Sequence, residues 1–405
     1  MKLNPPDVWR IKIQNYGMTD KSFIFAGGGT GGHIYPAIAV AEQIGKLQPT
    51  ARIRFLCSSR SIDTQILAKT GFDYIVLPAK GFSVRPGKLV SFCTSFLKSY
   101  KIAGKALSES KDPFVIGVGG FVAAPVCLAA YKRRVPIALL NVDIVPGRAN
   151  KIIGRWANEI FVQFEETGGY FADTGAKVSV VGCPLRSGFS NPQPQKAIEQ
   201  LGLDKDKKVL LITGASSGAE NINAAICSLL EKLDAFADNW QIVHLTGVSN
   251  FEKVKSKYDN AKISHKVLGY FDDMPDLLAA AELVVGRSGA VSVAEYAAAA
   301  VPSICIPYPY HKDKHQYLNA HKLVDAGAAV IAEDLPWHGH PFDYAQDRPG
   351  RVFTGWKPVP QLWRELEELM KNENRRQEMK RNCRKIARKD AAAKIAEKLG
   401  IAVRR

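Results

Sequence analysis

The sequence predicts an α/β protein with two doubly wound domains, each built on a parallel sheet covered by helices. Three observations lead to this fold class. The chain has 405 residues, more than one ordinary hydrophobic core holds. Short β-branched segments alternate with helical patterns from end to end, which is typical of parallel sheets. A break rich in Pro, Gln, Asn and Lys at 186–208 interrupts this alternation.

The positions of the expected strands follow from the buried, β-branched runs. In the first domain they are Ser22–Ala26, Arg52–Leu56, Tyr74–Leu77, Phe114–Val118, Pro136–Leu140 and Val178–Val181. In the second domain they are Val209–Thr213, Gln241–Leu245, Leu283–Val285, Ser303–Ile306 and Ala329–Ala332. Ligands of such sheets bind at the carboxyl ends of the strands, so we expect them in the cleft between the domains.

These patterns divide the chain into five parts. We expect a disordered extension at 1–20, an N-terminal domain at 21–186 and a linker at 187–207. A C-terminal domain follows at 208–385 and carries an irregular, Pro- and His-containing insertion at 336–360. The last segment, 386–405, is expected to be a helix that can return to the N-terminal domain.

Composition narrows the classes of partner. Lys and Arg exceed Asp and Glu by 55 − 39 = 16, so the surface should attract anions. No nucleic-acid-binding module is recognisable, and we expect no nucleic-acid partner. The seven cysteines show no C-x-x-C pairing, which predicts buried thiols rather than a disulfide or metal framework. The uncharged segment Phe114–Tyr131 contains glycines and a proline, which favours a strand, a turn and a helix over a membrane span.

The strongest motif is the segment Phe25–Pro36, which reads FAGGGTGGHIYP. A buried strand leads into five glycines, and a helix with apolar residues at helical spacing follows. Glycines let the backbone approach a ligand, and a helix N-terminus offers N–H groups and positive potential to a phosphate. The spacing differs from G-x-G-x-x-G with a later acidic residue, so a dehydrogenase is the weaker interpretation.

His33 lies in this loop, at the expected carboxyl edge of the first sheet. An imidazole titrates near neutral pH and can take a proton from an attacking hydroxyl. His33 is therefore a candidate general base, and the alternative is a structural histidine.

Three later segments repeat the strand–turn–helix device. Gly117–Phe121 follows a strand of the first domain, and Thr213–Ala219 and Gly286–Glu295 follow strands of the second. Together they indicate that two phosphorylated ligands meet in the cleft. Glu295 falls in the first turns of a helix, where it can hold ribose hydroxyls or merely complement the helix dipole.

These motifs together resemble the MurG family of glycosyltransferases. The resemblance rests on five segments in order: Gly28–His33 with Pro36, Gly119–Phe121, Gly182–Arg186, Arg287–Glu295 and His311–Ala320. It implies a GT-B fold and transfer of N-acetylglucosamine from UDP-N-acetylglucosamine to lipid I, giving lipid II for peptidoglycan synthesis and hence cell shape and division. It also implies an inverting reaction that needs neither a metal nor a cofactor.

The resemblance assigns roles to the domains and to particular positions. It implies that the N-terminal domain binds the acceptor and a membrane, and that the C-terminal domain binds the UDP-sugar. The positions for the donor UDP-N-acetylglucosamine are Thr30, Gly31, Gly32, Asp143, Arg186, Ser216, Phe271, Ala290, Val291, Ser292, Val293, Ala294, Glu295 and Gln316. Within this set Arg186 and Ser216 would meet the diphosphate, Phe271 the uracil, and Gln316 the sugar hydroxyls. The loops for the acceptor diphosphate contain Gly28, Gly29, Gly119 and Gly120. His33 stands where the family has its candidate base.

The chain departs from the family pattern at two places. The family commonly reads His-Glu-Gln-Asn where this chain has Leu140–Asp143, so Asn141 replaces a glutamate and Asp143 an asparagine. Ala215 replaces a glycine. Asp143 is therefore an alternative base, and a different lipid acceptor is an alternative function. A binding protein without catalysis is a third hypothesis, which the retained His33 and Glu295 disfavour.

A basic, aromatic segment at 80–105 suggests how the protein reaches a lipid substrate. Cations interleave there with large apolar residues, namely Lys80, Phe82, Arg85, Lys88, Leu89, Val90, Phe92, Phe96, Leu97, Lys98, Tyr100, Lys101 and Lys105. Such a helix can lie in the interface of an anionic membrane. We expect peripheral attachment to the cytoplasmic face of the cell membrane; the alternative is an ordinary amphipathic helix packed on the sheet.

Overall fold

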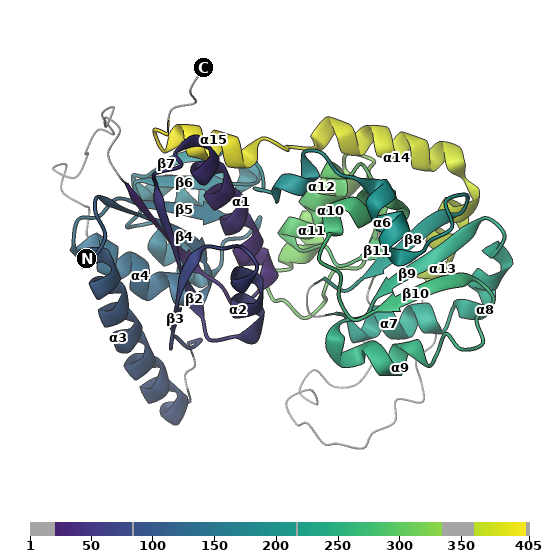
Figure 1. The fold of residues 1–405 in the computed structure, drawn as a ribbon, viewed down its shortest axis with the longest axis horizontal. Coiled ribbons are helices and arrows are strands. Elements are labelled where there is room, and N and C mark those ends of the chain that lie inside the picture. The colour runs from purple at the N-terminus through teal and green to yellow at the C-terminus, as the bar shows by residue number, and fades with distance from the viewer. Residues whose placement is uncertain (1–20, 83–84, 216–217, 334–359, 402–405) are drawn as a thin grey trace.

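The protein consists of two α/β domains side by side (Figure 1). The computed structural model describes residues 21–82, 85–215, 218–333 and 360–401. The extension expected at 1–20 lies outside the described residues. So does the insertion expected at 336–360, except for its last residue, with which a helix begins.

The N-terminal domain is built on seven parallel strands in the order β3-β2-β1-β4-β5-β6-β7. Their bounds are β1 Ser22–Gly27, β2 Arg52–Ser58, β3 Asp73–Leu77, β4 Pro113–Gly119, β5 Ile137–Asn141, β6 Glu159–Val162 and β7 Lys177–Val180. The sequence prediction located all but β6. That strand has four residues and begins with the buried, charged Glu159, so it lacks an extended apolar run.

Alternation along β1 places a core on each face of this sheet. Phe23 and Phe25 belong to one cluster, whereas Ile24 and Ala26 belong to the other, because successive side chains of a strand point to opposite faces. The covering helices are α1 Gly31–Leu47, α2 Ser61–Ala68, α3 Pro86–Ser108, α4 Gly120–Lys132, α5 Arg148–Ile153 and the 3-10 helix η2 Glu165–Thr174. The domain therefore has the predicted three layers.

The C-terminal domain repeats the plan with six parallel strands in the order β10-β9-β8-β11-β12-β13. The strands are β8 Lys208–Thr213, β9 Trp240–Leu245, β10 Ser264–Leu268, β11 Ala281–Gly286, β12 Ser303–Cys305 and β13 Ala329–Ile331. The prediction missed β10, an edge strand whose sequence SHKVL is partly polar and partly exposed. The helices are α7 Glu220–Cys227, α8 Leu230–Leu233, α9 Phe251–Lys255, α10 Met274–Ala280, α11 Ala290–Ala298, α12 His315–Val324, α13 Pro360–Lys371 and α14 Glu373–Ile386, with the 3-10 turns η4 Asp234–Phe236 and η5 Val248–Asn250.

The strand order reverses at corresponding places in the two sheets. In the N-terminal domain the switch lies between β1 and β4, and in the C-terminal domain between β8 and β11. Loops that follow the strands of a switch point diverge and leave room for a ligand. All four glycine-containing loops identified in the sequence follow one of these four strands, so the topology brings the predicted phosphate-binding loops to the switch points.

The chain passes between the domains twice. The segment 187–207, expected to be a linker, is largely regular: it contains the 3-10 turn η3 Ser187–Phe189 and the helix α6 Pro194–Leu201. Phe189 and Ala197 are buried in the core of the C-terminal domain, which is why this segment folds onto that domain.

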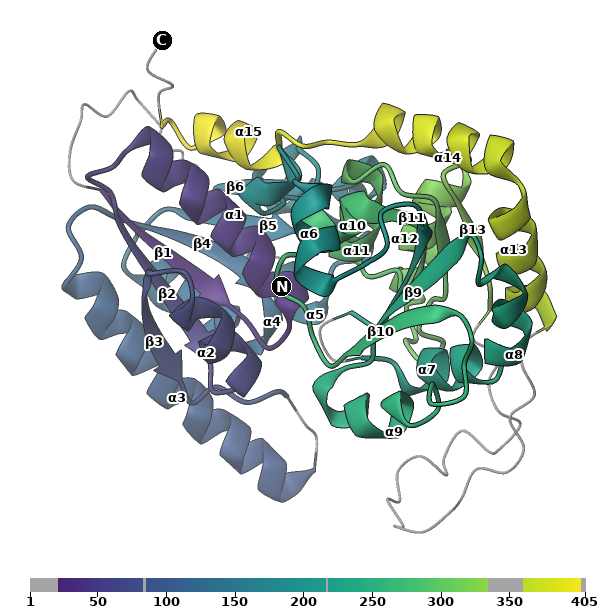
Figure 2. The same ribbon diagram turned by 45° about the vertical axis from the view of Figure 1, so that its right-hand side comes forward.

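The last helix, α15 Ala391–Lys398, lies against α1 in the N-terminal domain (Figure 2). Its residues Ile395 and Ala396, with Leu399 beyond the helix, are buried in the same cluster as Phe23. The segment that contains α15 therefore completes the hydrophobic core around β1 and α1.

Two composition-based expectations can be compared with the fold. The uncharged stretch Phe114–Tyr131 forms β4 and α4, as expected, and no described helix is long and apolar enough to cross a membrane. Five of the seven cysteines are buried, but Cys93 is exposed and Cys227 is half-buried, so the expectation of buried thiols is wrong for these two.

Candidate active site

The glycine loop between β1 and α1 is held by a buried carboxylate. The N–H of Gly29 donates to both carboxylate oxygens of Asp63, at 2.9 and 2.7 Å, and the Ser58 hydroxyl donates to Asp63 at 2.5 Å. Gly28 has a φ of +144°, and a Cβ there would lie 2.2 Å from the Asp63 carboxylate. Position 28 therefore requires glycine. The sequence analysis missed Asp63 because a single aspartate in the first turn of a helix, α2, carries no distinctive pattern.

The loops after β1 and β4 touch one another. A Cβ on Gly120 would lie 2.7 Å from the carbonyl oxygen of Gly28. The Arg60 guanidinium donates to the Gly29 carbonyl at 2.7 Å and lies 5.6 Å from the centre of the Phe121 ring. The two predicted acceptor-diphosphate loops thus form one surface, with a cation beside it.

His33 lies on the first turn of α1, half-buried. Its Nδ1 is 3.1 Å from the Thr30 hydroxyl, and a Cβ on Gly119 would lie 3.1 Å from its Nε2. Burial lowers the pKa of His33, while the negative charges of Asp143 and Asp63 partly oppose that shift. The imidazole is therefore biased toward the neutral form, which can accept a proton.

The segment that departs from the family pattern is fixed by a chain of side-chain amides. The buried Asn150 donates to Asn141 at 2.8 Å, and Asn141 donates to the backbone oxygen of Asp143 at 2.7 Å. Asn141 thus supports the loop, while the half-buried Asp143 carboxylate exerts its charge on His33. The structure brings the two candidate bases, His33 and Asp143, into one neighbourhood.

The same segment contacts the C-terminal domain. The N–H of Ile144 donates to Asn319 at 3.3 Å, and Asn319 donates to the Ser288 carbonyl at 3.4 Å. Nearby, Gln163 donates to the carbonyl of Ala290, the first residue of α11, at 3.2 Å. The N-terminus of α11 therefore lies at the boundary between the domains, where a ligand of both domains would sit.

Arg186 and Glu295 form an ion pair at this boundary. Their charged atoms are 3.6 Å apart, and their side chains are 17% and 13% exposed. Arg186 also lies over the Tyr35 ring, 4.3 Å from its centre, and donates to the Asp272 carbonyl at 2.9 Å. Burial raises the pKa of Glu295, and the charge of Arg186 opposes this shift. Two residues predicted to bind different parts of the donor are thus paired with each other.

Further interdomain contacts surround this pair. The hydroxyls of Tyr35 and Tyr270 are 2.5 Å apart, and Lys69 forms an ion pair with Asp272 at 2.8 Å. Burial and the hydrogen bond to Tyr270 raise the pKa of Tyr35, so its phenol stays neutral. The sequence analysis did not select Tyr35, although it lies two residues after His33 in the strongest motif.

The remaining residues predicted to bind the donor differ in how far their side chains are buried. Phe271 is buried in the core of the C-terminal domain, and Val291 and Val293 on α11 are also buried. These positions can offer a ligand their backbone more readily than their side chains. Gln316 is half-buried, and its side-chain oxygen accepts from the Tyr308 N–H at 3.0 Å. Ser216 lies outside the described residues.

Two described residues of the loop after β8, Ala215 and Gly218, have a positive φ. Ala215 has a φ of +61°, a region that disfavours a side chain. Gly218 has a φ of +74°, and a Cβ there would lie 2.2 Å from the Thr246 carbonyl. Glycine is therefore required at 218, whereas position 215 accommodates alanine with strain.

Known proteins resemble this chain over most of its length. Residues 23–162 match the glycosyltransferase family 28 N-terminal domain, and residues 209–336 match the corresponding C-terminal domain. A UDP-N-acetylglucosamine–N-acetylmuramyl-(pentapeptide) pyrophosphoryl-undecaprenol N-acetylglucosamine transferase of Thermoanaerobacter sp. (strain X514) is 32% identical over 92% of this chain and 97% of its own length. A transferase of the same name from Halothermothrix orenii is 36% identical over 78% of this chain and 87% of its own.

The chain belongs to the MurG family. A crystal structure of Acinetobacter baumannii MurG superposes with a TM-score of 0.66 at 24% identity, covering 94% of this chain and 99% of that one. A Neisseria meningitidis UDP-N-acetylglucosamine 2-epimerase, solved with UDP-N-acetylglucosamine bound, has a TM-score of 0.64 at 13% identity, covering 94% and 99%. These structural likenesses show the GT-B fold, in agreement with the sequence prediction.

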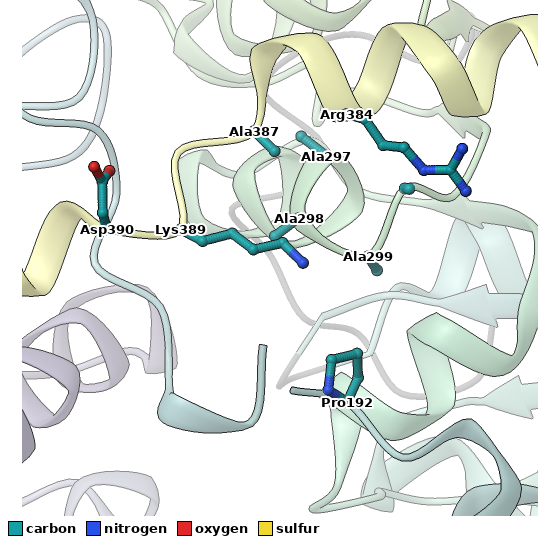
Figure 3. A pocket seen from close by; sticks show the side chains of 9 residues that line it. Pro192, Ala297, Ala298, Ala299, Arg384, Ala387, Lys389 and Asp390 are labelled. Carbon is teal, nitrogen blue, oxygen red and sulfur yellow. The ribbon is translucent and has the colours of Figure 1, made fainter. Parts of the chain in front are cut away.

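An open hollow lies at the C-terminal end of α11, whereas the candidate site lies at the N-terminal end of this helix. It has a volume of about 580 Å³ and is bounded by the C-terminal end of α11 and the α14–α15 connection (Figure 3). Ala297–Ala300 form one wall, and Pro192, Arg384 and Lys389 surround the opening. The hollow lies beside the α14–α15 connection, where the chain passes between the domains for the second time. It is separate from the glycine loops.

Proposed function

We propose that this protein transfers N-acetylglucosamine from UDP-N-acetylglucosamine to lipid I, undecaprenyl-diphospho-N-acetylmuramoyl-pentapeptide, and so forms lipid II for peptidoglycan. The observation that carries the proposal is the match to transferases of this name over nearly their full length. The pairing of Arg186 with Glu295 at the domain boundary and the neutral bias of His33 support it.

The donor is proposed to bind mainly to the C-terminal domain. The N-terminus of α11, from Ala290 to Glu295, supplies N–H groups and positive potential for the diphosphate. Glu295 holds the ribose hydroxyls, Gln316 the sugar, and Arg186 the diphosphate. The ion pair between Glu295 and Arg186 keeps these two side chains next to each other at the domain boundary.

The reaction is proposed to be a single displacement. A sugar hydroxyl of lipid I forms a bond to the anomeric carbon of N-acetylglucosamine, and the bond from that carbon to the UDP oxygen breaks. The hydroxyl proton passes to His33, whose lowered pKa keeps it neutral and ready to accept. The departing diphosphate takes the electron pair and is stabilised by Arg186 and the N–H groups of α11.

Two further features follow from this scheme. One displacement inverts the anomeric centre. The positive charge that the leaving group requires comes from Arg186 and the end of α11 rather than from a metal, so we propose a metal-independent transfer. The Gly28–Gly29 and Gly119–Gly120 loops, which touch each other, bind the acceptor diphosphate.

The N-terminal half of α3 is proposed to attach the protein to the cytoplasmic face of the cell membrane. Val90 and Leu97 are 65% and 60% exposed, as is Phe82 just before the helix at 60%. The helix extends beyond the body of the domain at this end (Figure 1). Its lysines supply attraction to anionic headgroups.

The decisive experiment incubates the purified protein with radiolabelled UDP-N-acetylglucosamine and lipid I. Transfer of label to the lipid phase, with a product that comigrates with lipid II, is the expected result. The same assay with another polyprenyl-linked sugar or a diacylglycerol tests the alternative acceptors. Label that enters those lipids but not lipid I would overturn the proposal, and so would hydrolysis to free sugar without transfer.

A further inference from the structure

Three side chains with metal-ligating atoms come together beside the proposed donor site. His311, Asp313 and His315 lie in the loop before α12 and at its first residue. Their ligand atoms all lie within 4.8 Å of one another, and among the described residues they are the one group of three or more that does so. The sequence analysis assigns no metal-binding residue, because the family resemblance implies a transfer without a metal.

The backbone brings the two imidazoles face to edge. Lys314, between Asp313 and His315, adopts a left-handed conformation with a φ of +47°. The chain turns there, and the rings of His311 and His315 approach to 4.3 Å between their centres at an angle of 80°. The imidazoles therefore converge although α12 has only just begun.

Asp313 fixes the orientation of one of these rings. Its carboxylate is 2.7 Å from Nδ1 of His315. A cation that takes the place of the proton shared by these two atoms is bound by both of them, so Asp313 and His315 can act as neighbouring ligands.

We propose that His311, Asp313 and His315 bind one divalent cation of the zinc class. Two imidazoles and one carboxylate form a ligand set that suits Zn²⁺, Co²⁺ or Ni²⁺, whereas Mg²⁺ and Ca²⁺ favour oxygen ligands. His311 and Asp313 are exposed and His315 is half-buried, so an ion can enter from solvent. Lys312 and Lys314 are also exposed, and water screens their charges from the site.

The proposed ion takes no part in the transfer reaction. The site adjoins Gln316 and the loop that begins at Tyr308, and the charge of Asp143 reaches His311 from the N-terminal domain. A bound cation would thus fix the loop that carries Gln316. The inference concerns binding of the metal alone and does not rest on the proposed function, so either can fail without the other.

The test is a calorimetric titration of ZnCl₂ into the full-length, tag-free protein. His338 and His340, outside the described residues, are replaced by glutamine to form the reference protein, because a His-x-His pair can itself bind zinc. We expect one Zn²⁺ per chain. His315→Gln, His311→Gln and Asp313→Asn should each weaken the affinity roughly 10-fold or more, since even groups that only support a metal ligand contribute that much.

A matched control lies on the same helix. His321 is 3.5 Å from Asp325 and forms a histidine–carboxylate pair without a third ligating residue among those described, so His321→Gln should leave the affinity unchanged. As a second readout, Co²⁺ should give visible absorption bands that disappear in His315→Gln. Absence of binding to the reference protein would overturn the proposal, as would equal affinities for it and His315→Gln.

Discussion

At the scale of single residues, the surroundings of His33 make it the better of the two candidate bases. Its pKa is lowered by burial, and Thr30 orients its ring. We therefore predict that His33→Ala lowers kcat roughly 10²–10⁴-fold, the usual contribution of a positioned base. UDP binding, measured by calorimetry, should change little. Asp143→Asn should lower kcat by a smaller factor than His33→Ala. Near-parental turnover in His33→Ala, with Asp143→Asn inactive, would assign the base to Asp143 instead.

The electrostatic contact between Asp143 and His33 predicts a particular pH dependence. A base works deprotonated, so the rate should fall as the pH drops through the pKa of His33, which lies below its usual 6.5. The negative charge of Asp143 raises this pKa. Its removal in Asp143→Asn should therefore shift the acidic limb of the kcat/KM profile to lower pH. A limb that stays in place or moves to higher pH would contradict the coupling.

Glu295 is predicted to contribute most of the ribose recognition. Losing hydrogen bonds to a charged group costs roughly 1.5–3 kcal/mol, so Glu295→Ala should weaken UDP binding by about 10- to 100-fold. The replacement also removes the partner of Arg186, which still donates to the Asp272 carbonyl. Glu295→Gln is the control, because it keeps the shape and loses only the charge. Unchanged affinity of the alanine variant for UDP would exclude this role.

At the scale of elements, α3 combines two different surfaces. Ala103 and Leu107, toward its C-terminal end, are buried against the domain, whereas Val90 and Leu97 are exposed. Burial of one end anchors the helix and leaves the other end available to a membrane. The periodicity of the sequence alone could not distinguish a membrane helix from one packed on the sheet.

The exposed end of α3 is predicted to drive membrane binding. Val90→Glu combined with Leu97→Glu should reduce sedimentation with anionic liposomes, since it replaces apolar contacts with charge. Binding of the parent should weaken as salt rises or anionic lipid is removed. Val248→Glu is a matched control, because Val248 is 78% exposed but lies in the other domain. Equal loss in the control, or salt-independent binding of the parent, would contradict this role.

At the scale of the whole molecule, the stability of the N-terminal domain depends on the end of the chain. Ile395 on α15 is 1% exposed and lies in the cluster formed around β1 and α1. Ile395→Ala should lower the free energy of unfolding by about 2–5 kcal/mol, the usual cost of such a truncation in a core. Urea denaturation measures this change. Lys394→Ala, at the neighbouring exposed position, should change it by less than about 0.5 kcal/mol; equal effects would argue against the docking of α15.

The sequence by itself determined the two-domain α/β architecture and most of the strands. Buried parallel strands have long apolar runs, and glycine-rich turns before helices are visible without any tertiary contact. The sequence analysis did not locate β6 and β10, because β6 is very short and β10 lies at an exposed edge of its sheet. The requirement for glycine at position 28 could be predicted in part from the sequence, since a run of glycines already indicates a close backbone approach.

Tertiary structure alone decided which groups meet. Asp63 beneath the glycine loop, Tyr35 beside Arg186, and α15 in the first core join residues far apart in the chain. Local propensity carries no information about such contacts, because they arise when strand order and domain packing bring separate loops together. The pairing of Arg186 with Glu295 and the convergence of His311 with His315 have the same origin. The sequence thus determined which kinds of groups the site contains, and the packing of the domains determined their partners.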